Sequence, residues 1–287
     1  MRTWRAPAKI NLCLRVLGRR PDGYHDLESV FQMVGLYDEV TIRPRRSGIV
    51  LTVEGAALPA GPGNLAYEAA AALAREAGGS RGAAIRLVKR IPLGAGLGGG
   101  SSDAATVLMG LNHMWGLGWS RGRLAELGAT LGSDVPFFFF GPTAWVTGRG
   151  ERVAPMPDAR PTPSGPVFPW AVLANPGITV STKWAFETFG LTNDRGVDRM
   201  PRSSQAPPAV PWSIPNDLER VTAATYPVVE EIKACLLKAG ARAARMSGSG
   251  PTVFGVFATR AEAAVACKDL SPSWRRWVVR LLRRAPW

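Results

Sequence analysis

Hydrophobic residues alternate with polar ones in several short segments of the first half of the chain. In residues 10–17 the apolar side chains Ile10, Leu12, Leu14 and Val16 occupy every second position, which is the period of a β-strand. Similar patterns predict further strands at residues 27–34, 39–43, 49–53 and 84–88. Helices are predicted at residues 64–77, 103–115 and 121–131, of which the first is rich in alanine and stops at two glycines.

The second half of the chain has the same mixture of elements after a proline-rich stretch. Prolines recur between residues 155 and 169 too densely for a helix interior or a central strand, so we expect domains at 1–160 and 161–287. Strands are predicted at 170–174, 242–246, 252–257 and 274–282, and helices at 181–189, 227–239 and 261–268. Residues 193–215 are polar and proline-rich, which predicts a flexible loop. This mixed order favours an α+β fold over a regular βαβ array.

The composition is that of a folded globular protein. Of the 287 residues, 46% are hydrophobic and 20% are charged, which excludes a chain that is mainly disordered. No run reaches the roughly 18 apolar residues of a membrane-spanning helix, and the N-terminus lacks the apolar segment of a secretory signal. The three cysteines are far apart, which argues against a disulfide framework and a cysteine zinc site. We therefore expect a cytoplasmic protein with no membrane partner.

The chain is strongly basic, with 35 lysine and arginine residues against 22 aspartate and glutamate residues and a net charge of +13. A basic surface attracts polyanions, so nucleic acid is a partner to consider. The densest basic cluster, at residues 275–284, is interleaved with apolar residues. That pattern favours the solvated edge of a final strand or helix over a nucleic-acid-binding arm, and we do not expect nucleic acid as a partner.

A glycine-rich segment gives the clearest indication of chemistry. Five of the seven residues from 94 to 100 are glycines, and two serines follow at the start of a predicted helix. Glycines let successive backbone N–H groups converge on an anion, and the helix start adds unpaired N–H groups and a positive dipole end. The serine hydroxyls can cap the helix, bind phosphate oxygens or hold Mg²⁺. We therefore predict a polyphosphate site formed by Pro92, Leu93, Gly94, Ala95, Gly96, Leu97, Gly98, Gly99, Gly100, Ser101 and Ser102.

Three common nucleotide-binding patterns do not explain this segment. A Walker A loop ends in Gly-Lys-Ser/Thr, which the segment lacks. Gly94, Gly96 and Gly99 fit the dinucleotide-binding pattern, but no acidic residue stands about 20 positions further on to bind a ribose. The next acid after Asp103 is Glu126. The His-Arg-Asp and Asp-Phe-Gly motifs of protein kinases are also missing, so another class of phosphate-binding protein is expected.

Three segments resemble the GHMP kinase superfamily, which includes galactokinase, homoserine kinase and mevalonate kinase. They are residues 6–12 (APAKINL), 94–105 (GAGLGGGSSDAA) and 246–252 (MSGSGPT). Three more segments resemble one branch, whose substrate is a cytidine-diphosphate-linked methylerythritol; they are residues 18–27 (GRRPDGYHDL), 131–137 (LGSDVPF) and 215–219 (PNDLE). The resemblance, which covers about residues 6–282, implies a two-domain α+β GHMP kinase fold. In that fold an N-terminal, ATP-binding domain related to a ribosomal-protein fold packs on a ferredoxin-like C-terminal domain.

The resemblance also implies an activity. It is the ATP-dependent phosphorylation of the hydroxyl at the 2-position of that substrate, a step of the non-mevalonate route to isoprenoid precursors. ATP is then the co-substrate, and Mg²⁺ accompanies it, held mainly by phosphates rather than by a dedicated set of protein ligands. Two alternatives remain open, namely another GHMP small-molecule kinase of the homoserine or mevalonate type, and a basic RNA-binding protein on a ribosomal-type fold. Both a monomer and a homodimer are compatible with the sequence.

By resemblance, Asp134 is the catalytic acid/base and Lys9 is the active-site lysine. An aspartate beside a helix end and an apolar run can take the proton of an alcohol during phosphoryl transfer. A lysine in an otherwise apolar strand can steady that carboxylate and orient the hydroxyl. Asn11 shares a strand face with Lys9, so we expect it to bind substrate.

The resemblance places a slot for the cytosine base. Tyr24 and His25 match positions that hold the base by stacking and hydrogen bonding, and Phe186 matches the opposing aromatic wall, with Trp184 as an alternative. Stacking on an aromatic side chain contributes about 1–3 kcal/mol per base in nucleic-acid platforms. Homoserine and mevalonate carry no base, so these residues distinguish the branch from the rest of the superfamily.

Three further positions are assigned by the resemblance. Asn64 resembles the asparagine on the adenine side and is also a suitable N-cap for the helix that it opens. Gly248 and Ser249 belong to a third glycine motif, which closes over the substrate or the phosphates. Asp103 stands where some relatives have asparagine, and the residues leave open whether it contacts metal or phosphate or turns away.

Overall fold

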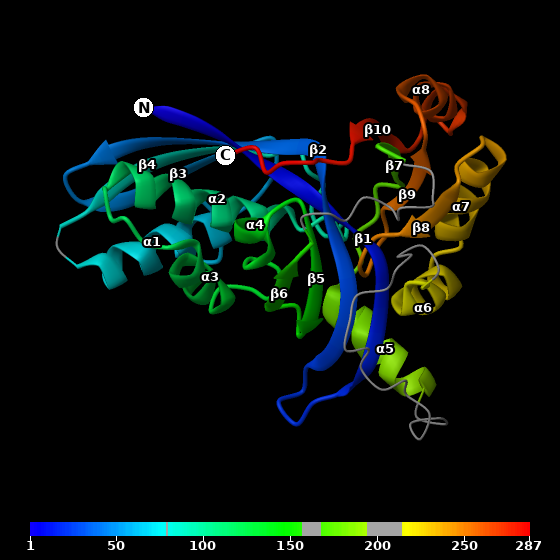
Figure 1. The fold of residues 1–287 in the computed structure, drawn as a ribbon, viewed down its shortest axis with the longest axis horizontal. Coiled ribbons are helices and arrows are strands. Elements are labelled where there is room, and N and C mark those ends of the chain that lie inside the picture. Colours follow the sequence, from blue (N-terminus) through cyan, green and yellow to red (C-terminus); the bar gives the residue numbers. More distant parts are fainter. Residues whose placement is uncertain (79, 157–167, 194–213) are drawn as a thin grey trace.

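Two β-sheets and the helices packed on them form the molecule (Figure 1). The computed structural model describes residues 1–78, 80–156, 168–193 and 214–287. In this part of the chain the strands are β1 (Arg2–Arg19), β2 (His25–Arg45), β3 (Gly48–Glu54), β4 (Gly82–Val88), β5 (Thr143–Gly148), β6 (Arg152–Pro155), β7 (Trp170–Asn175), β8 (Ala243–Met246), β9 (Val253–Phe257) and β10 (Arg275–Arg280). The helices are α1 (Leu65–Ala77), α2 (Gly99–Met114), α3 (Arg121–Ala129), α4 (Phe137–Phe140), α5 (Thr182–Asn193), α6 (Asp217–Thr225), α7 (Val228–Lys238) and α8 (Arg260–Asp269).

The first sheet has the strand order β3-β4-β2-β5-β6, and β1 pairs with β2 as a long antiparallel hairpin. Helices α1 to α4 pack against this sheet around a core that includes Phe31, Leu108 and Phe137. In Figure 1 the hairpin, drawn in blue, passes between these helices on the left and the second sheet on the right. The hairpin therefore connects the two halves of the molecule.

Strand β1 is buried on both of its faces. Ile10 packs into a core shared with the second sheet, where it joins Leu173 and Phe254. Lys9 and Asn11 alternate with it on the other face and are only 4% and 1% exposed. The polar positions of this strand therefore point into the protein, which is unusual for lysine and asparagine unless their polar atoms have partners.

The second sheet has the order β10-β7-β9-β8. Helices α6, α7 and α8 contribute to the core on one of its faces, and the other face packs toward β1 and β2. Beyond β10 the chain returns to the first sheet, where the Leu282 N–H donates a 3.0 Å hydrogen bond to the Met33 carbonyl. Trp287 packs against the core of the first sheet, so the chain end helps to hold the halves together.

The predicted α+β class is confirmed by the two sheets and their helices. The strands predicted at 27–34 and 39–43 are parts of one strand, β2. Between them the register of β2 with β1 shifts, at Pro7 and Ala8, which marks a bulge. Such a bulge bends a strand without ending it. The sequence patterns do not predict β5, β6, α4 or α6, and α2 begins at Gly99, before its predicted start.

Two expectations concern residues that the structure does not describe. The domain boundary between residues 160 and 161 lies outside the described residues, and so does most of the loop predicted at 193–215. Helix α5 continues to Asn193, beyond the predicted end at residue 189. Within the described ranges, no helix is both long and apolar enough to cross a membrane.

Candidate active site

Lys9 and Asp134, which are 125 positions apart in the sequence, meet at the centre of the candidate site. Lys9 Nζ lies 3.4 Å from Asp134 Oδ2, donates a 2.7 Å hydrogen bond to Asn11 Oδ1, and stands 4.4 Å from the centre of the Phe31 ring. Asp134 lies in the turn between α3 and α4, with 30% of its side chain exposed. A buried ammonium thus faces a carboxylate that a substrate can still reach.

Asn11 is used to orient Lys9. Its Oδ1 accepts the hydrogen bond from Lys9, and its Nδ2 donates a 2.9 Å hydrogen bond to Ser29 Oγ. Both ends of the side-chain amide therefore have partners inside the protein. The structure brings Asn11 to the site, as predicted, but in contact with the lysine.

The glycine-rich loop passes directly beside Lys9. The Lys9 N–H donates a 2.9 Å hydrogen bond to the Leu97 carbonyl. Gly94, Gly96 and Gly98 all have positive φ angles, of 56°, 73° and 66°. A Cβ on Gly98 would lie 2.9 Å from Lys9 Cγ, so this position has room only for glycine.

Helix α2 starts at the end of this loop without a side-chain cap. Its N-cap is Gly98, which has no side chain to accept from the first-turn N–H groups. Those N–H groups and the positive end of the helix dipole are therefore available to an anion. Ser101 is partly exposed here, and its Oγ lies 3.8 Å from the place a Cβ would take on Gly132, two positions before Asp134.

The third glycine motif closes against the loop and β1. Ser247 Oγ donates a 2.8 Å hydrogen bond to the Gly96 carbonyl and accepts a 3.2 Å one from the Asn11 N–H. A Cβ on Gly248 would lie 3.2 Å from Asn11 Oδ1. Ser249 is buried, and its Oγ is 3.0 Å from Thr182 Oγ1. The three segments of the resemblance therefore meet in space.

Asn216 is a site-supporting residue that the sequence analysis did not single out. Its Nδ2 donates hydrogen bonds to the carbonyls of Met246 and Gly248, at 2.9 and 2.7 Å. Its Oδ1 accepts from the Leu218 N–H at 3.1 Å and so caps α6. The segment at residues 215–219, noted only for its resemblance, was the available signal for this role.

The aromatic residues predicted to hold a base lie at the tip of the β1–β2 hairpin and on α5. The rings of His25 and Phe186 stack on each other with centroids 5.2 Å apart, so they leave no gap for a base between them. Burial, with the Arg19 charge as a second cause, lowers the pKa of His25 and favours its neutral form. Tyr24 is 54% exposed. Trp184 meets the edge of Tyr226, at 5.8 Å, and forms a separate pair.

The side-chain amide of Asn64 makes its hydrogen bonds within its own helix and the loop before it. Its Oδ1 accepts a 3.0 Å hydrogen bond from the Ala66 N–H, and its Nδ2 donates a 2.9 Å one to the Pro59 carbonyl. The predicted capping role is therefore confirmed. A cleft of about 280 Å³ is lined by residues 55–57 and 89–93, which include Pro92 and Leu93, together with residues 175, 177–179 and 275.

Asp103 is buried in the protein, where it pairs with Lys89. Its Oδ2 accepts a 2.6 Å hydrogen bond from Lys89, which also bonds to Asp38. Burial, against the opposing pull of Lys89, raises the pKa of Asp103 to about 8. Ser102 is buried as well, and its hydroxyl has no partner in the described part of the chain. Of the two serines, Ser101 is therefore the one that remains accessible.

Two family models match separate segments of this chain, and curated relatives match it along nearly its whole length. The GHMP kinases N terminal domain matches residues 64–142, and the GHMP kinases C terminal domain matches residues 208–274. A 4-diphosphocytidyl-2-C-methyl-D-erythritol kinase of Syntrophotalea carbinolica is 47% identical over 97% of this chain and 98% of its own length. The protein of the same name from Geobacter metallireducens is 48% identical over 96% of each chain.

Solved structures agree with these matches. The crystal structure of a 4-(cytidine 5'-diphospho)-2C-methyl-D-erythritol kinase has 34% sequence identity and a TM-score of 0.78, and the match covers 97% of this chain and 98% of that one. A homoserine kinase from Cytophaga hutchinsonii shares the fold, with a TM-score of 0.71 and 18% identity over 98% of this chain and 95% of that one.

Proposed function

This chain belongs to the 4-diphosphocytidyl-2-C-methyl-D-erythritol kinases of the GHMP kinase superfamily, and we propose from this the reaction that it catalyses. It transfers a phosphoryl group from ATP to the hydroxyl at the 2-position of 4-diphosphocytidyl-2-C-methyl-D-erythritol, in the non-mevalonate route to isoprenoid precursors. The structural observation that carries the proposal is the 3.4 Å pair of Lys9 and Asp134 beside the glycine-rich loop.

We assign the proton transfer to Asp134. Phosphoryl transfer depends mostly on positioning and on charge stabilisation, with a base that takes the proton of the attacking alcohol. The part-exposed Asp134 carboxylate is suited to that task, and the buried Lys9 ammonium stabilises it by charge. Asn11 holds Lys9 in this orientation through its 2.7 Å hydrogen bond, so we treat Asn11 as a residue that positions the lysine.

We assign the ATP phosphates to the glycine-rich loop and the start of α2. The positive φ angles at Gly94, Gly96 and Gly98 and the uncapped helix start support an anion site. The adenosine is proposed to occupy the cleft lined by residues 55–57 and 89–93. In this arrangement Asn64 shapes the loop beside that cleft, because both ends of its amide are bonded within the chain.

Mg²⁺ is proposed to bind with ATP, mainly through phosphate oxygens, with the Ser101 hydroxyl as the protein group that fits it. Ser101 is accessible at the helix start and close to the turn that carries Asp134, whereas Ser102 is buried. A hydroxyl oxygen is a suitable ligand for this hard cation. When bound, Mg²⁺ would neutralise charge on the transferred phosphoryl group.

The cytidyl end of the substrate is proposed to lie at the tip of the β1–β2 hairpin. The exposed Tyr24 ring offers one face to a base, and Phe186 and His25 form the adjoining aromatic wall. We place Gly248 and Ser249 against the substrate or phosphates, because their motif touches Asn11 and the glycine-rich loop.

We also propose the two domains 1–160 and 161–287, since the matched family segments end and begin on either side of that boundary. A cytoplasmic location suits the reaction.

The proposal is tested by measuring ADP release with ATP and Mg²⁺ and four acceptors, which are the cytidyl substrate, homoserine, mevalonate and galactose. We expect turnover with the cytidyl substrate alone. ADP release without any acceptor serves as the control for ATP hydrolysis. Turnover with homoserine or mevalonate and none with the cytidyl substrate would contradict the proposed substrate. The assignment of the chain to the GHMP kinase superfamily would still hold.

A further inference from the structure

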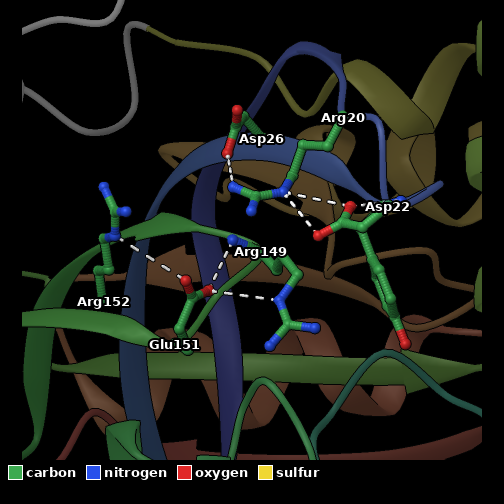
Figure 2. A network of polar contacts seen from close by, with 7 residues as sticks. Arg20, Asp22, Asp26, Arg149, Glu151 and Arg152 are labelled. Carbon is green, nitrogen blue, oxygen red and sulfur yellow. Dashed lines mark hydrogen bonds and ion pairs between the residues drawn. The ribbon is translucent and has the colours of Figure 1, made fainter.

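The β1–β2 hairpin tip and the β5–β6 turn, whose side chains Figure 2 shows together, are each held by ion pairs. At the hairpin tip, Arg20 bonds to Asp22 and Asp26 at 3.1 and 2.9 Å. In the turn, Glu151 accepts a 2.7 Å hydrogen bond from the Arg149 N–H. Both loops are therefore ordered by their own acidic residues.

The β5–β6 turn reaches both ends of the proposed substrate site. A Cβ on Gly150 would lie 3.4 Å from Asp134 Oδ1, so the turn stands against the proposed catalytic carboxylate. The Arg149 guanidinium carbon, one residue earlier, lies 4.8 Å from the centre of the Tyr24 ring. The turn that carries Arg149 thus contacts both the Tyr24 ring and the proposed catalytic carboxylate.

The arginines of this region differ in the state of their hydrogen-bond donors. Arg20 is neutralised by two carboxylates. Arg152 has 73% of its side chain exposed and lies 3.9 Å from Glu151. Arg149 is 30% exposed, its Nε is 4.0 Å from Glu151, and its two terminal nitrogens have no hydrogen-bond partner in the residues that the structure describes. A guanidinium stacked on a ring keeps its in-plane N–H donors free for a second partner.

We propose that Arg149 binds the diphosphate bridge of the nucleoside-diphosphate substrate. This inference rests on the proposed function, in which the base lies at Tyr24 and the acceptor hydroxyl at Asp134. The diphosphate joins these two parts of the substrate, and Arg149 is a cation with free donors on the turn that contacts both Tyr24 and Asp134. Its planar fork matches two phosphate oxygens, and its contact with Tyr24 fixes it in place.

The test compares ligands with and without the diphosphate. Binding of CDP and of cytidine is measured by calorimetry with a saturating non-hydrolysable ATP analogue, so that CDP does not fill the ATP site. The variants are Arg149→Met, which keeps the length of the side chain, Arg149→Lys, which keeps the charge, and Arg152→Met as a control on the same turn. Thermal melting and the KM for ATP establish that each variant is folded.

Arg149→Met is expected to weaken CDP binding by about tenfold to a hundredfold, the range of a lost charged hydrogen bond, and to change cytidine binding by less than about twofold. Arg149→Lys should lose less, and Arg152→Met should bind both ligands as the wild type does. Equal losses for CDP and cytidine would overturn the proposal, because Arg149 would then only support Tyr24. Unchanged CDP binding would also overturn it. Failure of the wild type to phosphorylate the cytidyl substrate is a separate result, which would contradict the proposed function.

Discussion

The Lys9 ammonium lies 3.4 Å from the Asp134 carboxylate and 2.7 Å from the amide oxygen of Asn11. Because Lys9 is buried, its charge acts on Asp134 with little screening by water. Its backbone N–H is bonded to Leu97 in the glycine-rich loop, so one residue connects the phosphate-binding loop to the proposed base. This connection relates the position of the phosphates to the position of the carboxylate that receives the proton.

Replacement of Asp134 tests its role as the base. Asp134→Asn keeps the size of the side chain but removes the proton acceptor, so kcat should fall by about 10²–10⁴-fold. The KM for ATP should stay within about twofold, because the phosphate-binding loop is unchanged. Steady-state ADP release measures both values. Asp269→Asn, at an exposed position, is the matched control, and near-normal turnover of Asp134→Asn would remove it as the base.

Replacement of Phe186 tests the proposed aromatic wall. Phe186→Ala removes a ring that stacks on His25, so the proposed wall beside the base loses its support, and we expect the KM for the cytidyl substrate to rise by about tenfold, within the range of an aromatic contact to a base. The KM for ATP should not change. Trp184→Ala is the matched control, because Trp184 packs on Tyr226 instead. A larger effect of Trp184→Ala than of Phe186→Ala would show that the wrong aromatic residue was chosen.

Local sequence patterns predicted most of the helices and strands, but not β5, β6, α4 or α6, and not how the elements pack together. The period of two in residues 10–17 identifies a strand and puts Lys9 and Asn11 on one face. It does not reveal that this face is covered by the loops around Leu97 and Ser247. That coverage depends on contacts between residues that are far apart in the sequence, Lys9 with Leu97 and Asn11 with Ser247, and periodicity does not encode such contacts.

The candidate site also has a part that local sequence predicts and a part that depends on distant contacts. The glycine-rich loop was predictable because its chemistry is contained in one continuous segment. The pairing of Lys9 with Asp134 came from resemblance alone, since no local pattern links residues that far apart. The orientation of Asp103 was open in the sequence, and the buried Lys89, which is on a different segment, turns it inward.

Removal of the Asn216 side chain should destabilise the third glycine motif. Asn216→Ala deprives the buried carbonyls of Met246 and Gly248 of their partner and also removes the cap of α6. The free energy of unfolding should fall by about 2–4 kcal/mol, measured by urea denaturation. Asn216→Asp separates the two roles, because it keeps the capping oxygen but loses both donors. If Asn216→Asp were as stable as the wild type, the hydrogen bonds to the two carbonyls would not matter.

The buried Asp103 should make stability depend on pH. Its pKa is raised to about 8 in the folded protein by burial, with Asp38 adding to the shift and Lys89 opposing it. In the unfolded chain an aspartate is ionised above about pH 4, so at intermediate pH the folded state holds a proton that the unfolded state has lost. The contribution of Asp103 to stability therefore falls as the pH rises from about 4 toward about 8.

Asp103→Asn should make this pH dependence less steep. Asparagine stays uncharged at every pH and keeps an oxygen for the hydrogen bond from Lys89, so the linked proton disappears while the contact remains. Urea denaturation at several values between pH 5 and pH 8 would show a smaller loss of unfolding free energy than in the wild type. Some slope should persist, because burial also raises the pKa of Asp217. Asp269→Asn, at the surface, should leave the slope unchanged. An equal slope in Asp103→Asn and in the wild type would mean that Asp103 is ionised throughout this range and that another group carries the pH dependence.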